Sequence, residues 1–180
     1  MMANRYSPSN IQNIADKKIF FDANILIYLF WASASSSWEN QYASLYTKLN
    51  AQNNKFVLDY IVLSEFINRA TRIEYDNYLT TNSITKNSLS YKDYRNSLDG
   101  QTALEDIYLT VTQDILNEFE VVEKSYSKND LTMMCVLDNL DFSDKAIEKI
   151  CHENQFVLLT NDTDFGSSNI DILSCHKKLR

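Results

Sequence analysis

Short apolar runs alternate along the chain with longer segments of helical periodicity. Five runs have the length and the mainly apolar character of buried strands, at residues 19–21, 56–58, 119–122, 156–160 and 170–173. Between them, apolar side chains recur at the spacing of one helix face, for example at Leu63, Phe66, Ile67, Ala70 and Ile73. Strands that alternate with helices favour a parallel sheet covered on both faces. We therefore predict an α/β fold with a mostly parallel sheet of about five strands.

Capping patterns indicate where two further helices begin. Ser36-x-x-Glu39 and Ser127-x-x-Asp130 both have the spacing of a capping box. The first precedes an amphipathic segment, and the second is expected to open a helix that ends near Asn139.

The composition changes between residues 76 and 101, where Asn, Ser, Thr and Tyr predominate and Gly100 closes the segment. We interpret it as a polar insertion in a single domain spanning residues 1–180, because a chain of this length with 44% hydrophobic residues suits one core. Tyrosines in and beside the insertion alternate with Lys and Arg, so they could stack on single-stranded RNA or pack the insertion. They are Tyr75, Tyr78, Tyr91 and Tyr94.

The charge balance argues against a broad basic surface for nucleic acid. The chain has 17 basic and 24 acidic residues, a formal net charge of −7. A nuclease whose acidic side chains hold divalent cations is not excluded, since bound ions would then determine the local field. Lys145 and Lys149 could contact a phosphate backbone or belong to a solvated helix face.

Cysteine usage and the first residues of the chain indicate a cytoplasmic protein. Cys135, Cys151 and Cys175 are widely spaced and odd in number, so neither a disulfide framework nor a zinc site is predicted. Residues 1–16 lack the basic and apolar segments of a signal peptide. The longest apolar run, residues 25–31, is too short to span a bilayer, so no membrane association is expected.

Acidic residues recur where strands end and helices begin. Asp22 follows the first strand, Glu65 lies near the start of the helix after the second, and Asp144 opens the helix before the strand at 156–160. Asp162 and Asp164 follow that strand. All could face the carboxyl edge of one sheet, where ligands bind in open α/β folds. Clustered carboxylates repel, and they usually gather to hold Mg²⁺ or Mn²⁺, two of which can promote phosphodiester hydrolysis.

Each acid also has an ordinary structural explanation. Asp22 could form an Asx-turn, with Asn24 capping the following helix. With Asp141 as N-cap, Asp144 falls at the third helical position, which favours a carboxylate in any helix. Glu65 could be a solvated helix residue, and the Asn-Asp-Thr-Asp sequence that ends at Asp164 is common in turns. These explanations must all hold at once to exclude a metal site.

Four segments, taken in order, resemble the PIN-domain family, and within it the VapC-type toxins. They are Phe-Phe-Asp22-Ala-Asn24-Ile-Leu-Ile-Tyr, Leu63-Ser-Glu65-Phe, Asp141-Phe-Ser-Asp144-Lys-Ala-Ile147 and Leu158-Leu-Thr-Asn-Asp162-Thr-Asp164-Phe165. The resemblance implies a three-layer α/β/α fold and a Mg²⁺- or Mn²⁺-dependent endoribonuclease. It also implies an RNA substrate, a protein antitoxin as partner and a homodimer.

Carried over by position, the resemblance assigns Asp22, Glu65, Asp144 and Asp162 as catalytic, metal-binding acids. Asp164 would be a fifth metal-binding acid, and Asn24 would support the site from behind the ligands. Two alternatives remain: a non-catalytic PIN scaffold or RNA-binding module, and a haloacid-dehalogenase-like phosphohydrolase. The second expects an acid two residues after Asp22, where this chain has Asn24.

Overall fold

The computed structural model describes residues 3–31 and 37–179, and its centre is a six-stranded, entirely parallel sheet. The strand order is β1-β6-β5-β2-β3-β4. The strands are β1 (Arg5–Tyr6), β2 (Lys18–Phe21), β3 (Lys55–Leu58), β4 (Glu120–Val121), β5 (Val157–Leu159) and β6 (Ile172–Leu173). The five predicted strands are confirmed, and β1 is an additional edge strand. It was missed because two half-buried residues make no apolar run.

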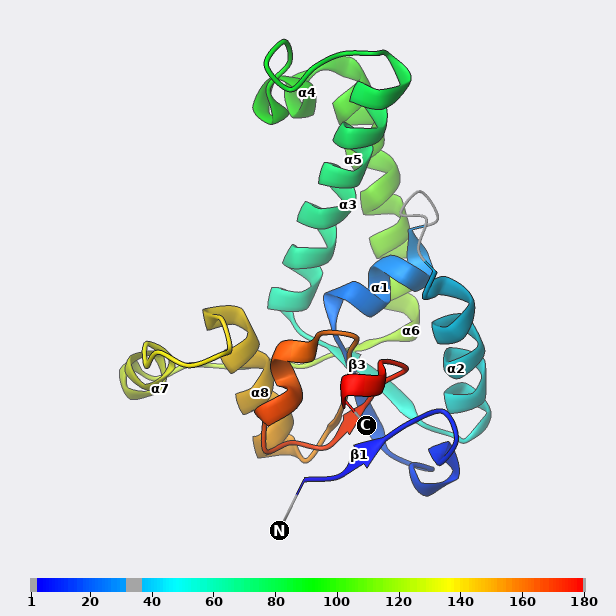
Figure 1. Cartoon of the computed structure of the whole chain (residues 1–180), viewed down its shortest axis with the longest axis vertical. Helices are drawn as coiled ribbons and strands as arrows, with labels where there is room; N and C mark the ends of the chain where they lie inside the picture. Colours follow the sequence, from blue (N-terminus) through cyan, green and yellow to red (C-terminus); the bar gives the residue numbers. More distant parts are fainter. Residues whose placement is uncertain (1–2, 32–36, 180) are drawn as a thin grey trace.

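Helices cover both faces of the sheet and extend well beyond it (Figure 1). The longer ones are α1 (Ala23–Phe30), α2 (Glu39–Ala51), α3 (Tyr60–Thr81), α5 (Leu98–Thr110) and α8 (Phe142–Asn154). The shorter ones are α4 (Tyr91–Asn96), α6 (Leu116–Glu118) and α7 (Lys128–Met134), with a π-helical turn η3 (Val111–Ile115) between α5 and α6. Single 3₁₀ turns are η1 (Ile11–Asn13), η4 (Thr163–Ser167) and η5 (Lys177–Leu179). This is the predicted three-layer α/β/α arrangement.

The central strands β2 and β5 lie in the middle of the core. Phe20 and Leu158 are paired in register and fully buried, as are their neighbours Phe21 and Leu159. Burial on both faces explains why these strands are continuously apolar and do not alternate with polar residues. Among the described residues, no helix is long and apolar enough to cross a membrane.

The predicted insertion corresponds to the far end of a helical projection. α3 and α5 run side by side away from the sheet, and α4 with its flanking loop forms the tip (Figure 1). The range 76–101 therefore begins inside α3 and ends inside α5. Tyr75, Leu79 and Tyr94 form a small core separate from the main one, in which the ring centroids of Tyr75 and Tyr94 are 5.5 Å apart. This confirms packing as the use of these tyrosines.

Two predicted helix ends differ from the structure. The Ser127–Asp130 capping box forms, but α7 ends at Met134, before the predicted Asn139. Val136 and Leu137 are exposed, so no apolar face holds a further turn against the body. Ser36 lies outside the described residues, and α2 begins at Glu39.

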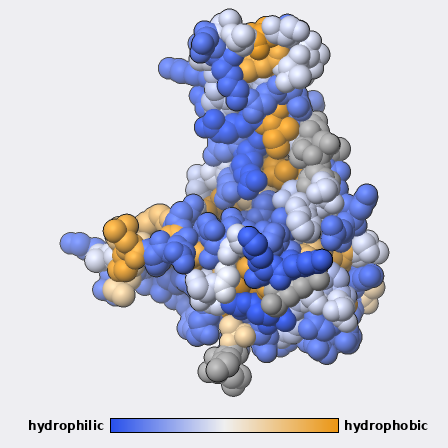
Figure 2. Space-filling view, viewed as in Figure 1, coloured by the Kyte–Doolittle hydropathy of each residue, from blue (hydrophilic) through white to orange (hydrophobic). Residues whose placement is uncertain are grey.

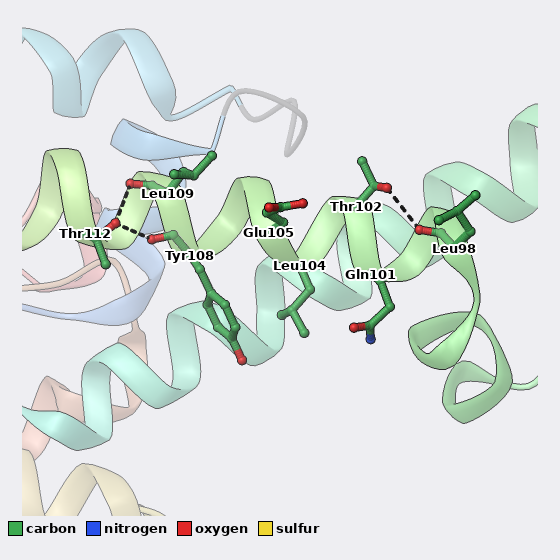
Figure 3. Close-up of a pocket in the computed structure, with 8 residues that line it drawn as sticks. All are labelled: Leu98, Gln101, Thr102, Leu104, Glu105, Tyr108, Leu109 and Thr112. Atoms are coloured by element: carbon green, nitrogen blue, oxygen red, sulfur yellow. Dashed lines mark hydrogen bonds between the residues drawn. The ribbon is translucent and has the colours of Figure 1, made fainter.

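Exposed apolar side chains gather over α7 and along the projection, whereas the rest of this view is mainly polar (Figure 2). The α5 face carries a hollow of about 400 Å³. Figure 3 shows the described residues that line this hollow; they come from the α5–η3 segment, and Glu105 is the only acid among them. The clustered acids lie elsewhere.

Candidate active site

The carboxyl ends of β2, β3 and β5 meet at one edge of the sheet, beside the start of α8. The three strands are neighbours, since Phe20 of β2 pairs with both Val57 of β3 and Leu158 of β5. A hollow of about 450 Å³, here called the acidic hollow, opens at this edge. Its lining comprises Asp22, Asn24, Tyr60, Ile61, Ser64, Glu65, Asn68, Arg69, Asp141, Ser143, Asp144, Asp162 and Asp164. All five predicted metal-binding acids and Asn24 therefore line the same hollow.

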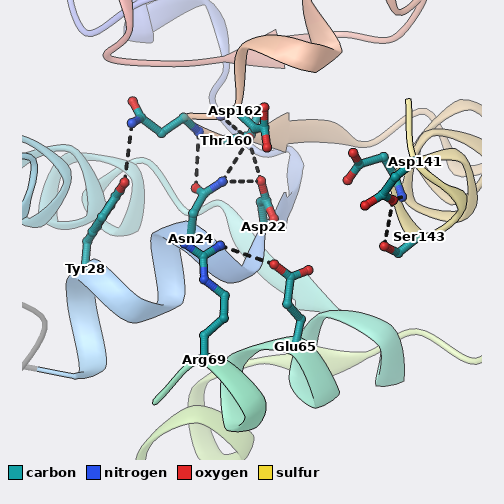
Figure 4. A network of polar contacts seen from close by, with 11 residues as sticks. Asp22, Asn24, Tyr28, Glu65, Arg69, Asp141, Ser143, Thr160 and Asp162 are labelled. Atoms are coloured by element: carbon teal, nitrogen blue, oxygen red, sulfur yellow. Dashed lines mark hydrogen bonds and ion pairs between the residues drawn. The ribbon is translucent and has the colours of Figure 1, made fainter. Parts of the chain in front are cut away.

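Asp22 is held in place by buried hydrogen bonds (Figure 4). Its side chain lies at the floor of the acidic hollow with 4% exposure. The amide of Asn24 and the hydroxyl of Thr160 each donate to Oδ2 of Asp22 at 2.5 Å. The Asn24 carbonyl oxygen in turn accepts from the backbone N–H of Asn161 at 3.2 Å. A carboxylate with two donors on one oxygen keeps a fixed orientation.

The sequence suggested that Asn24 caps the following helix, but it does not. α1 begins at Ala23, with Asp22 at the N-cap position, so Asn24 is already inside the first turn. Its side chain links Asp22 to the loop after β5 instead. The dehalogenase-like alternative expects an acid two residues after Asp22, and this position is Asn24.

Burial and mutual repulsion raise the pKa values of two acids. Burial raises the pKa of Asp22 to about 6, and the charges of Glu65 and Asp162 add to this, whereas the Thr160 hydrogen bond opposes it. Burial also raises the pKa of Asp144 to about 7, with further contributions from Asp141, Asp22, Asp162 and Glu65. These acids are close enough to repel one another.

The acids share the acidic hollow without forming a closed cage. Within residues 3–31 and 37–179, no three acidic, histidine or cysteine side chains lie close enough to hold one metal ion as they stand. Glu65 and Asp144 are only partly buried, so their side chains can change rotamer toward Asp22. The lining acids offer oxygen ligands, and the described residues of the lining include no His or Cys. This ligand chemistry suits Mg²⁺ or Mn²⁺.

Glu65 belongs to the second turn of α3, near the start of the helix as predicted. The helix begins at Tyr60 behind Asp59, whose side chain accepts from the N–H of Val62. Nη1 of Arg69 lies 3.2 Å from Oε1 of Glu65, and both side chains are partly exposed. Sequence reasoning missed Arg69, although its spacing of four residues from Glu65 is the usual signal of such a pair.

The loop after β5 forms a turn and also contributes Asp162 and Asp164 to the lining of the acidic hollow. Oδ1 of Asp162 accepts from the N–H of Asp164 at 3.0 Å, and the N–H of Asp162 donates to Thr160 Oγ1. Asp162 therefore does have the predicted role in a turn, which uses its Oδ1. Asp141 is the N-cap of α8 and accepts from the N–H of Asp144, as predicted. Its own presence in the acidic hollow was not foreseen.

The lysines of α8 are in ion pairs. Nζ of Lys145 lies 3.1 Å from Asp138, and Nζ of Lys149 lies 2.9 Å from Asp130 and 2.7 Å from Glu153. Neither lysine lines the acidic hollow. This favours the structural alternative over phosphate contact. No disulfide forms among the described residues, and Cys151 and Cys175 are buried.

Comparison with known proteins rests on the fold, because no family model and no curated protein matches the sequence. The FitAB complex bound to the IR36 DNA fragment contains a chain with a TM-score of 0.51 and 10% identity, over 87% of this chain and 94% of that chain. A chain of VapBC2 from Rickettsia felis, bound to a DNA fragment from its promoter, has a TM-score of 0.46 and 16% identity, over 87% of this chain and 98% of that chain. The PIN domain endonuclease Utp24 has a TM-score of 0.37 and 12% identity, over 91% of this chain and 89% of that chain.

Identities this low concern the fold alone. The parallel sheet, its helices on both faces and the hollow at its carboxyl edge agree with the arrangement that the sequence resemblance implied. The chain has the fold of a PIN domain.

Proposed function

We propose that the protein is a metal-dependent endoribonuclease that hydrolyses RNA phosphodiester bonds. The observation that carries this proposal is the convergence of Asp22, Glu65, Asp144 and Asp162 from four separate segments on one hollow. The cost of such a cluster is visible in the raised pKa values of Asp22 and Asp144. Divalent cations would offset this cost, and a fold without such a role has no reason to maintain it.

In this proposal Asp22 anchors a first ion, and Asp144 and Asp162 share in holding it. Glu65 either holds a second ion or orients the attacking water, and Asp164 is a candidate fifth ligand. When bound, the pair of ions supplies an activated water and stabilises the leaving oxygen of the phosphodiester. Mg²⁺ and Mn²⁺ are the ions proposed.

The surrounding residues keep the acids in position. Asn24 and Thr160 both donate to Oδ2 of Asp22 and so hold its carboxylate in one orientation. The hydrogen bond from Thr160 also favours the ionised carboxylate that a cation requires. The backbone bonds at Asp162 and Asp144 fix the loop and the helix start that carry these two acids.

Hydrolysis by water predicts the ends of the products. Attack by water leaves a 3′-hydroxyl and a 5′-phosphate, because the 2′-hydroxyl takes no part. Products that end in a cyclic phosphate would require the 2′-hydroxyl as nucleophile and would contradict this mechanism.

We further propose that the protein is the toxin of a toxin–antitoxin pair, restrained by a protein antitoxin and able to form a homodimer. The support is the resemblance of the four sequence segments to VapC-type toxins, together with a fold shared with a chain of the FitAB complex.

The test is cleavage of a pool of structured and single-stranded RNA with Mg²⁺ or Mn²⁺, comparing the unaltered protein with Asp22→Asn and Asp162→Asn. Cleavage that requires metal and disappears in both variants is expected. Glu105→Gln, which removes an acid outside the acidic hollow, is the matched control and should cleave normally. Metal binding without cleavage by antitoxin-free protein would favour the non-catalytic scaffold.

A further inference from the structure

The wall of the acidic hollow that α3 forms differs from the others in its chemistry. It consists of Tyr60, Ile61, Ser64, Glu65, Asn68 and Arg69, which we call the α3 wall. The spacing places them in two adjacent rows over about three turns of one helix face. Glu65 is its only acid, whereas the other walls carry Asp22, Asp141, Asp144, Asp162 and Asp164. The hollow therefore has an acidic side and a side of hydrogen-bond donors with an aromatic ring.

Tyr60 is an exposed ring on a rigid support. Its exposed fraction is 78%, against 53% for Phe142 and 49% for Tyr108, the other well-exposed aromatic residues in the described part of the chain. It is the first residue of α3, directly after the buried N-cap Asp59. The backbone of Tyr60 is therefore fixed while its ring faces solvent at the hollow. Such a ring offers a flat surface on which a base can stack at little entropic cost.

The polar residues of the α3 wall have unused hydrogen-bonding capacity. Within the described residues, the side chains of Tyr60, Ser64 and Asn68 make no hydrogen bond to protein. They follow one another at intervals of four residues, so they form a continuous row on the helix. Unpaired donors that line a hollow are available to a ligand that crosses it.

Among the described residues, Arg69 is the only basic one that lines the acidic hollow. Its partner Glu65 is a partly exposed residue one turn away, and such pairs on a helix surface are weak. A phosphate oxygen can therefore replace this partner, particularly if Glu65 turns toward a cation.

We infer that the α3 wall binds a single-stranded segment of the RNA substrate, with an unpaired base stacked on Tyr60 beside the cleaved phosphodiester. Ser64, Asn68 and Arg69 contact its sugar–phosphate backbone. The identity of the ligand rests on the proposed function. A duplex has its base faces covered by neighbouring bases, so it cannot use Tyr60 in this way. With a net charge of −7, the chain gains little from general attraction to phosphates, and stacking compensates for this because it does not depend on charge.

Binding can be measured apart from cleavage in an Asp22→Asn background. The probes are a short fluorescent RNA strand of mixed sequence, the same strand annealed to its complement, and the DNA strand of the same sequence, each followed by anisotropy with and without Mg²⁺. Tyr60→Ala should weaken binding of the single strand about tenfold, as loss of one stacked base does. Tyr60→Phe should bind much more tightly than Tyr60→Ala, because it keeps the ring on which the base stacks. Tyr108→Ala removes an exposed tyrosine of α5 and is the matched control.

Arg69→Gln tests the backbone contact. It should weaken binding of the strand and lower the slope of log affinity against log salt by about 0.7, the value for one phosphate of a single strand. Tyr60→Ala should leave that slope unchanged, because a stacked base releases no counterion.

The inference is overturned if Tyr60→Ala binds the strand as well as the background protein does, if the duplex binds as tightly as the strand, or if no probe binds. Its failure is distinct from that of the proposed function. Metal-dependent cleavage that Tyr60→Ala leaves unaffected would refute only the inference that the α3 wall binds the RNA strand. Tyr60-dependent binding of the strand, without cleavage by the unaltered protein, would support RNA binding by the α3 wall and refute the proposed nuclease function.

Discussion

The hydroxyl of Thr160 donates a 2.5 Å hydrogen bond to Oδ2 of Asp22, although the two residues are 138 positions apart in sequence. The contact joins the ends of the neighbouring strands β5 and β2. Thr160 is fully buried, and its oxygen also accepts from the N–H of Asp162. One hydroxyl group thus connects two of the acids on which the proposed chemistry depends.

Thr160→Val should raise the pKa of Asp22 above its present value of about 6, because the lost hydrogen bond favours the ionised form. The pH at which Mn²⁺ binds half-maximally should shift upward, and stability should fall by about 1–2 kcal/mol, since a buried acceptor loses a partner. Calorimetric titration of Mn²⁺ over a range of pH measures the first effect, and urea unfolding measures the second. Thr160→Ser keeps the hydroxyl and should behave as the unaltered protein. An unchanged pH profile in the valine variant would show that this bond does not tune Asp22.

The metal-free protein should lose stability as the pH rises from about 4 to about 7. The folded-state pKa values of Asp22 and Asp144 are raised to about 6 and about 7, so the folded chain binds more protons than the unfolded chain in this window. The free energy of unfolding through these two groups therefore falls with rising pH, and the loss is complete above about pH 7. Thermal unfolding in the presence of a chelator measures it.

Added Mg²⁺ should reverse this loss, because a cation stabilises the ionised carboxylates. The increase in melting temperature on adding Mg²⁺ should be larger at about pH 8 than at about pH 5. An increase of equal size at both pH values would mean that Mg²⁺ binds away from these acids.

Asp22→Asn should abolish cleavage and yet stabilise the metal-free protein at neutral pH. Asn offers one oxygen that can still accept from Asn24 and Thr160, and it removes a charge that is costly to bury. A rise in pKa from 3.8 to about 6 corresponds to about 3 kcal/mol, which is the upper limit of the gain. Urea unfolding at neutral pH should show the gain, which should disappear in acid, where Asp22 is protonated. A less stable variant at neutral pH would show that the carboxylate has a structural role.

The convergence of the acids could be predicted from the sequence because each one lies at or near a point where an apolar strand ends or a helix begins. In a parallel sheet those points meet at one edge, so Asp22 and Asp162 are brought together by topology alone. Arg69 and Tyr60 could not be found in this way. Their place in the acidic hollow depends on which face α3 turns toward this hollow, and the amphipathic pattern of α3 leaves several faces polar. Asn24 shows a further limit, because capping preference is local whereas its actual partners lie in the loop after β5.

Gly100→Ala should disrupt the tip of the projection and leave the acidic hollow intact. A Cβ at Gly100 would lie 2.0 Å from the carbonyl oxygen of Tyr94 and 2.9 Å from the Cα of Arg95, so α4 must move away from α5. We expect a loss of about 1–3 kcal/mol, the usual range for overpacking. Tyr75 and Tyr94 should become more exposed as their small core separates from α5.

Hydrogen exchange would locate this effect, with faster exchange expected over α4 and the adjoining ends of α3 and α5. Metal-dependent cleavage should persist, because the small core is separate from the one that supports β2 and β5. Gly166→Ala is the matched control, since the nearest atom to its new Cβ would be Leu179 Cδ2 at 3.9 Å, an ordinary contact. If Gly100→Ala also reduced metal-dependent cleavage, the small core of the projection and the acidic hollow would have to fold as one unit.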